Sequence, residues 1–154
     1  MIGEGFTEAP HVAAIREQVR RFVAAEAPPE KRKAWDAAHR WPRDVYQRFN
    51  ALGFAGLTVP EAYGGAGQDL VAAVAVIEEL ALAGAVLAGP YIHTAFYGGM
   101  NLSENGSEEQ KAHFLPRLAR GEMFFAYGLS EPDVGGDLAS VTTRAERVGD
   151  EIVV

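Results

Sequence analysis

The spacing of the apolar residues changes near Gly121, and this change limits the folds that are open to the chain. Before Gly121, apolar side chains recur every three or four residues, as in segment 13–27, which is typical of amphipathic helices. After it, residues 123–129 read MFFAYGL, an apolar run typical of a buried strand, and residues 141–148 alternate with a period of two. We therefore predict a mainly α chain, in which helices come first and strands follow.

The end of the sequence suggests that the β part is truncated. Gly149 and Asp150 predict a turn, and the EIVV that follows begins a third strand with no further sequence to pair with it. We therefore expect an N-terminal helical domain of about five or six helices over residues 1–121. Residues 122–154 are expected to begin a second, β domain that belongs to a longer protein.

Local signals mark where the helices are expected to begin. Asp69 is a candidate N-cap for an apolar helix at 70–83. Ser107 and Gln110 form the S-x-x-Q pattern of a capping box, which opens a helix that runs to about Arg120. The other expected helices lie at 13–27, 29–38, 42–52 and 91–104.

Glycine and proline are expected to end or interrupt these helices. Gly53 is a natural C-cap for the helix at 42–52, whose Val45, Phe49 and Leu52 share one face. Pro116 is expected to bend or interrupt the last helix. The residues expected to separate the helices at 70–83 and 91–104 are Gly84, Gly89 and Pro90.

Composition excludes several classes of function. The 154 residues carry a formal charge of −7 and no basic cluster, so we predict no nucleic-acid partner. There is no cysteine, which excludes disulfides and cysteine-ligated metals from this chain and fits the cytoplasm. The four histidines lack metal-ligand spacing, so no metal is predicted.

Targeting and membrane segments are also not expected. The N-terminal MIGEGFTEAP has no basic region followed by an apolar core, so it does not have the pattern of a signal peptide. The longest apolar run is interrupted by Glu78 and Glu79, which favours a buried helix over a membrane span. These two glutamates are expected to form the polar edge of that helix.

The segment GLSEPDVGGDL at 128–138 carries more polar groups than a chain reversal requires. It offers a hydroxyl from Ser130 at the end of the expected strand, and Gly135 and Gly136 allow a ligand to approach the backbone. Tyr127 adds an aromatic face beside the loop. A flat, polar, heteroaromatic cofactor would suit these features, and a plain turn with side-chain hydrogen bonds is the alternative.

Four segments together make the chain similar to the N-terminal part of an acyl-CoA dehydrogenase. They occur in the order and at the separations found in that family, and the resemblance covers nearly the whole chain. The last of them resembles the flavin-loop signature of the family. The segments are LGFAGLTVPEAYGGAGQDL (52–70), IEELALAG (77–84), NGSEEQKAHFLPRLARGE (105–122) and AYGLSEPDVGGDLASVTTRAERVGDEIVV (126–154).

The resemblance implies a fold, a cofactor and partners. Family members have an N-terminal helical domain, a barrel-like middle β domain and a C-terminal helical bundle, and they hold FAD between the last two. They carry out α,β-dehydrogenation of an acyl-CoA thioester, with hydride transfer to flavin N5, in fatty acid metabolism. An electron-transfer flavoprotein usually accepts the electrons, and the subunits form homo- or hetero-oligomers, as dimers or tetramers.

The resemblance also implies roles for particular residues. Tyr127, Leu129, Ser130, Gly135 and Gly136 match the flavin-binding loop, with Ser130 expected to hydrogen-bond near flavin N5. The catalytic glutamate of the family lies in its C-terminal bundle, so no catalytic residue is expected in this fragment, which alone should be inactive.

Substrate contacts are expected on a different helix and at one position of the loop. Phe96 and Gly99 lie on a helix that borders the acyl pocket in the family, and core packing is the alternative for both. The family usually has serine where this chain has Gly136, which is also expected to face substrate. The missing hydroxyl removes one hydrogen bond, worth about 0.5–1.5 kcal/mol.

Three other functions stay open at this stage. The same fold carries flavin oxidases and monooxygenases, including nitroalkane-oxidase-like enzymes, in which oxygen rapidly reoxidises the flavin. A non-catalytic partner subunit of a heteromeric dehydrogenase would supply half a flavin site. A purely helical interaction module is disfavoured by the flavin-loop pattern and by the change to strands.

Overall fold

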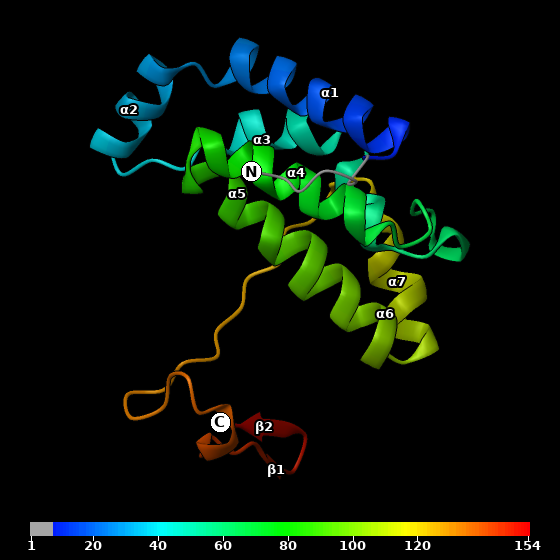
Figure 1. Ribbon diagram of the computed structural model, residues 1–154. Helices are drawn as coiled ribbons and strands as arrows, with labels where there is room; N and C mark the ends of the chain where they lie inside the picture. The colour runs from blue at the N-terminus through cyan, green and yellow to red at the C-terminus, as the bar shows by residue number, and fades with distance from the viewer. Residues whose placement is uncertain (1–7) are drawn as a thin grey trace.

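The structure is a computed structural model that describes residues 8–154, so most of the segment considered for a signal peptide lies outside it. The chain forms a helical body followed by an extended segment and a small hairpin (Figure 1). The α-helices are α1 (Pro10–Glu26), α2 (Pro29–Ala37), α3 (Arg43–Asn50), α4 (Leu70–Ala83), α5 (Ala85–Tyr91), α6 (Asn101–Asn105) and α7 (Glu108–Ala119). The remaining elements are the 3₁₀ turns η1 (Phe54–Thr58), η2 (Glu61–Tyr63) and η4 (Leu138–Ser140), the π-helix η3 (Ile92–Met100), and the strands β1 (Glu146–Val148) and β2 (Glu151–Val153).

Helix α1 packs along α4, and a buried carboxylate joins the two. The Glu79 side chain is 4% exposed and accepts hydrogen bonds from Arg20 at 2.7 and 2.8 Å and from Arg16 at 3.1 Å. Glu78, on the more exposed side of α4, also binds Arg16. The two glutamates therefore serve helix packing, as the polar-edge interpretation predicts.

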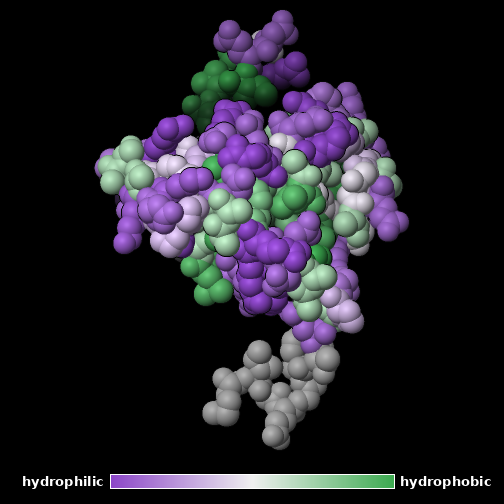
Figure 2. Space-filling view, turned by 90° about the horizontal axis from the view of Figure 1, so that it is seen from above, coloured by the Kyte–Doolittle hydropathy of each residue, from purple (hydrophilic) through white to green (hydrophobic). Residues whose placement is uncertain are grey.

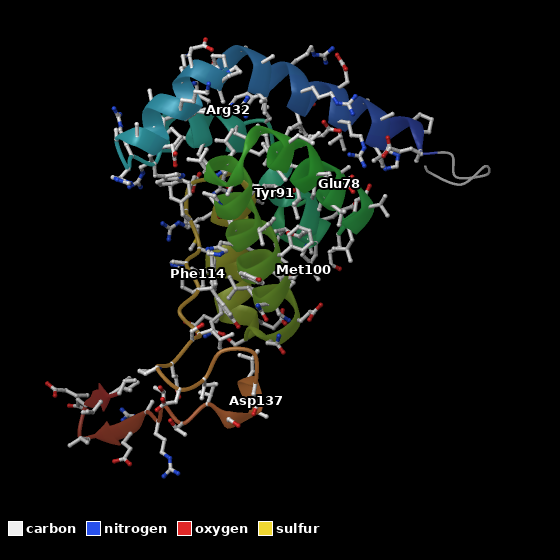
Figure 3. All side chains as sticks on the ribbon, turned by 60° about the vertical axis from the view of Figure 1, so that its left-hand side comes forward. Arg32, Glu78, Tyr91, Met100, Phe114 and Asp137 are labelled. Carbon is white, nitrogen blue, oxygen red and sulfur yellow. The ribbon has the colours of Figure 1, made fainter. Side chains whose placement is uncertain are left out.

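Aromatic side chains fill the centre of the helical body. Tyr46 and Phe49 of α3 and Tyr91 of α5 are at most 1% exposed, and Phe49 lies edge-on to Tyr91 with ring centroids 6.0 Å apart. The Tyr91 hydroxyl donates to the Phe54 carbonyl at 3.1 Å, which satisfies its only buried polar group (Figure 3). Viewed from above, the outer surface of this body is mostly hydrophilic, with small apolar patches (Figure 2).

Both predicted N-caps are confirmed. The Asp69 carboxylate accepts from the Ala72 amide at 2.9 Å at the start of α4. At the start of α7, the Ser107 hydroxyl accepts from the Gln110 amide at 3.2 Å, and the Gln110 side chain accepts from the Ser107 amide at 2.8 Å. Each cap satisfies amide groups that the first turn of a helix leaves free.

The prediction that Gly89 and Pro90 separate two helices is wrong. Only Gly84, with φ +119°, breaks the chain, and helix then continues without a gap from Ala85 to Asn105. Pro90 lies inside α5, and the π-helix begins two residues later. Pro90 has no backbone N–H and cannot donate an α-helical hydrogen bond. The series of α-helical hydrogen bonds is therefore already interrupted just before the π-helix, with its longer-range hydrogen bonds, begins.

Two smaller expectations about helix ends also need correction. Leu52 lies beyond the end of α3 and is 38% exposed, so it does not share the buried face of Val45 and Phe49. Pro116 does not interrupt α7, which runs through it to Ala119.

The β part is smaller than predicted. Residues 123–129 form no strand, because no other strand among residues 8–154 lies beside them to exchange hydrogen bonds. Of segment 141–148, only the last three residues pair, antiparallel with β2. The predicted turn at 149–150 closes this hairpin, and Gly149 there adopts φ +67°.

The structure also bears on the membrane prediction. Within residues 8–154, no helix combines the length and apolar character that crossing a bilayer demands.

Candidate functional site

Residues 127–143 form a loop that projects from the helical body, with Asp137 at its far end in this view (Figure 3). Glu131 and Val134 close its inner turn, with reciprocal backbone hydrogen bonds of 2.9 and 3.2 Å. Val134 is the buried side chain of this turn, at 8% exposure. Pro132 lies between the two and donates no hydrogen bond, which fits a turn position.

The Glu131 carboxylate closes the wider loop. It accepts from the Thr143 amide at 2.7 Å, and from the Thr142 amide and hydroxyl at 3.0 Å each. Hydrogen bonds from Thr143, and then from Thr142, lower the pKa of Glu131 to about 2. The carboxylate is therefore ionised at neutral pH and holds the loop by hydrogen bonds, as predicted, instead of serving as a base.

The residues predicted to face the flavin are exposed along this loop. Leu129 is 37% exposed, and Ser130 also reaches the surface. A Cβ added at Gly135 or Gly136 would meet nothing within 4 Å, so the backbone at both is open to a ligand. Exposed backbone amides and a free hydroxyl suit the polar edge of a flat heteroaromatic ring.

Tyr127 connects this loop to the helical body. Its ring stacks on Tyr97 of the π-helix, with centroids 4.9 Å apart and an angle of 28°. Tyr97 in turn lies 5.4 Å from the ring of His93. The π-helix therefore positions the start of the loop through an aromatic stack, which extends the aromatic face predicted for Tyr127.

An apolar cavity of about 370 Å³ adjoins the start of the loop. One wall comes from α5 and the π-helix, and the other from residues 124–126 with Trp41. Trp41 meets Phe124 edge-on, with centroids 5.1 Å apart, and Arg43 covers the Phe124 ring at 5.1 Å. The lining residues are Trp41, Gly89, Pro90, His93, Thr94, Phe124, Phe125 and Ala126.

Phe96 and Gly99, predicted to contact substrate, do not line this cavity. Phe96 packs against the core beside Tyr91, at 6.5 Å between centroids. A Cβ added at Gly99 would lie 2.6 Å from the Thr58 hydroxyl, so close helix packing accounts for this glycine. Their substrate roles stay predictions.

Sequence reasoning did not single out His93 or Trp41 for this cavity. Trp41 and Phe124 lie far apart in the chain, and no local pattern indicates that they meet. Gly89 and Pro90 were the one sequence feature that indicated this cavity. Glycine and proline both destabilise a helix, so their presence inside an apolar helix indicates a local packing or ligand requirement.

Comparison with known proteins identifies the relatives of this fold. The sequence profile "Acyl-CoA dehydrogenase, N-terminal domain" matches residues 9–122. The chain is 33% identical over 144 residues to the short-chain specific acyl-CoA dehydrogenase of Clostridium acetobutylicum. It is 38% identical over 141 residues to the probable acyl-CoA dehydrogenase fadE25 of Mycobacterium leprae. These matches include 91% of the chain, which spans only 37% and 36% of the two proteins.

Solved structures of similar sequence share the fold. A glutaryl-CoA dehydrogenase from Mycobacterium smegmatis in complex with FADH2 matches 94% of the chain, at a TM-score of 0.84 and 30% identity. The ChsE4–ChsE5 complex from Mycobacterium tuberculosis matches 96%, at a TM-score of 0.75 and 31% identity. The chain spans 37% of each of these structures. The chain therefore belongs to the acyl-CoA dehydrogenase family.

Proposed function

We propose that this chain is the N-terminal part of an FAD-dependent acyl-CoA dehydrogenase that acts on an acyl-CoA thioester. The observation that carries the proposal is the loop held by Glu131, which leaves Ser130, Gly135 and Gly136 open and follows directly on residues 124–126, which line an apolar cavity. Membership of the family supports it, as does the neighbour with bound FADH2.

The residues of this loop fit FAD. Ser130 would donate or accept a hydrogen bond at the ring edge, and the open backbone at Gly135 and Gly136 would lie against it. The aromatic side chain of Tyr127 and the aliphatic side chain of Leu129 would limit access of water to the same side. Bound FAD would supply the acceptor for the hydride that leaves the β-carbon of the acyl group.

The apolar cavity is the proposed place for the acyl chain. Phe124 and Trp41 form its aromatic walls, and its lining offers no carboxylate, arginine or lysine to an alkyl chain. The base that removes the α-proton is expected beyond residue 154, as the family resemblance implies. Glu78, Glu79 and Glu131 are engaged in structural hydrogen bonds.

We further propose the partners that the family resemblance implies, and the cytoplasmic location that the cysteine-free sequence fits. An electron-transfer flavoprotein would accept the electrons, and the protein would act as an oligomer in the cytoplasm. A partner-subunit role is the second candidate, because Gly136 stands where the family usually has serine and a Cβ there would meet nothing. The similarity to the ChsE4–ChsE5 complex is consistent with an assembly of two different subunits.

The visible spectrum of the full-length protein tests both candidates. A yellow protein that is bleached without oxygen by one class of acyl-CoA would support the dehydrogenase and name its substrate class. A yellow protein that no thioester bleaches would favour the partner subunit or an altered chemistry. Failure to bind FAD at all would contradict the assignment of residues 127–136.

A further inference from the structure

A second, cationic groove lies on the helical body and shares Trp41 with the apolar cavity. It has a volume of about 470 Å³ and runs between α2, the connection to α3, and the junction of α4 and α5. Ligand pockets in proteins commonly have volumes of about 300–1,000 Å³, so the groove is large enough for a small molecule. The residues used below are Arg32, Lys33, Trp35, His39, Arg40 and Trp41.

The positive charges of this groove are not neutralised by ion pairs. Among residues 8–154, six of the eleven arginines and lysines outside the groove have a carboxylate within 4.0 Å and five have none, whereas none of the three in the groove, Arg32, Lys33 and Arg40, has one. The groove contains one carboxylate, Asp36, so three positive charges face one negative charge. The net charge of the whole chain is −7, so an average surface patch would be negative, whereas this groove has an excess of positive charge.

Arg32 is the fixed member of this group. Its guanidinium donates to the Ala83 carbonyl at the end of α4, which holds the side chain between α2 and α4 (Figure 3). Its Nε is buried and has no hydrogen-bond partner within residues 8–154. A buried donor without a partner is costly. An anion bound in the groove would offset part of this cost through the charge of the guanidinium.

Both tryptophans of the chain line the same groove. Trp41 is 37% exposed, and Trp35 packs partly against the core. Next to them, His39 adopts φ +47°, a left-handed conformation that is uncommon for any residue other than glycine. Two indole faces next to unpaired cations suit a ligand that combines a flat ring with a phosphate.

We propose that this groove binds a nucleotide, with its phosphate on Arg32, Lys33 and Arg40 and its base against the tryptophans. The nucleotide can be a free molecule or part of a larger one, such as the nucleotide half of coenzyme A. The chemistry is the same in both cases, and the experiment below separates them.

Isothermal titration calorimetry with adenosine 5′-monophosphate tests the proposal, on full-length protein that has been loaded with FAD and then freed of unbound FAD. The double variant Lys33→Gln, Arg40→Gln removes two exposed cations of the groove. We expect it to raise the Kd about tenfold or more, since charge-assisted hydrogen bonds are lost. The matched control Lys31→Gln, Arg117→Gln removes the same charges from exposed positions outside the groove, and its Kd should stay that of the parent.

Two further titrations complete the test. Inorganic phosphate should bind more weakly than the nucleotide because it cannot stack on the indoles. If saturating acyl-CoA leaves nucleotide binding intact, the ligand is a free nucleotide. If acyl-CoA prevents it and the groove variant raises the KM for acyl-CoA, the groove holds the nucleotide half of the substrate. Equal Kd values for parent and groove variant, or equal affinity for phosphate and nucleotide, would overturn the proposal.

Discussion

Gly89 and Gly99 lie in one continuous helical segment, and the structure predicts a much larger loss of stability for alanine at Gly99 than at Gly89. A Cβ added at Gly99 would lie 2.6 Å from Oγ1 of Thr58, which is fully buried and donates to the Ala95 carbonyl at 2.5 Å. A Cβ added at Gly89 would meet nothing within 4 Å.

The magnitudes follow from these contacts. Alanine is better than glycine in a helix by about 1 kcal/mol, and this gain applies at both positions. At Gly99, overpacking costs about 1–3 kcal/mol. The displaced Thr58 hydrogen bond costs about 0.5–1.5 kcal/mol more. We therefore expect Gly99→Ala to lower the free energy of unfolding by about 0.5–3.5 kcal/mol. Gly89→Ala should change it by less than about 1 kcal/mol, because Pro90 disfavours the helical conformation in a preceding residue that has a Cβ and so opposes the gain.

The assay is urea unfolding of the full-length protein, followed by far-ultraviolet circular dichroism at a fixed concentration of protein and FAD. The two alanine variants are matched controls for one another, because both replace a helical glycine by the same residue. An unfolding midpoint for Gly99→Ala that equals or exceeds that of the parent would refute the packing argument.

The same pair of glycines distinguishes packing from substrate contact. Gly89 lines the apolar cavity, so Gly89→Leu should fill part of its 370 Å³. We expect kcat/KM for the longest accepted acyl-CoA to fall about tenfold or more relative to a short one. Gly99→Ala should leave this ratio unchanged. A shift in chain-length preference for Gly99→Ala alone would restore the substrate role predicted for Gly99.

Three further predictions concern carboxylates. Glu79→Gln weakens the bonds from Arg16 and Arg20 and should lower the free energy of unfolding by about 1–2 kcal/mol, with Glu78→Gln as a milder control in the same urea assay. Hydrogen bonds from Arg20 lower the pKa of Glu79, so its stabilisation is complete above about pH 4.5 and is lost as the pH falls through the lower, folded pKa. The difference between parent and Glu79→Gln should therefore shrink below pH 4.5, and a constant difference would contradict the ion-pair explanation. Glu131→Gln removes the charge that accepts the hydrogen bonds from Thr142 and Thr143, so the Kd for FAD should rise about tenfold. An unchanged Kd would show that other contacts hold the loop.

Features that depend on neighbouring residues in the sequence were predictable. The Asp69 cap and the Ser107–Gln110 capping box each join groups that lie three residues apart, so the sequence contains the whole interaction. The flavin-loop pattern was visible for the same reason, since Glu131 and Thr142 lie in one short segment.

Features that depend on distant residues were not predictable from one sequence. The apolar cavity forms only because Trp41 meets Phe124, and Gly99 is confined only because Thr58 lies against it. Pro90 was expected to end a helix, because its missing N–H is a local signal. The π-helix that follows lets the segment continue, and that outcome depends on tertiary packing.

Residues 123–129 and the loop that follows them differ in whether their structure depends on a neighbouring strand. Residues 123–129 have the composition of a strand, but a strand needs a neighbour, and none lies beside them among residues 8–154. The loop needs no neighbour, because Glu131 binds the backbone of Thr142 and Thr143 and Val134 closes the inner turn. The surface proposed to meet the flavin can therefore take its shape from hydrogen bonds within residues 131–143. This arrangement leaves Tyr127, stacked on Tyr97, as the contact that sets where the loop lies relative to the apolar cavity.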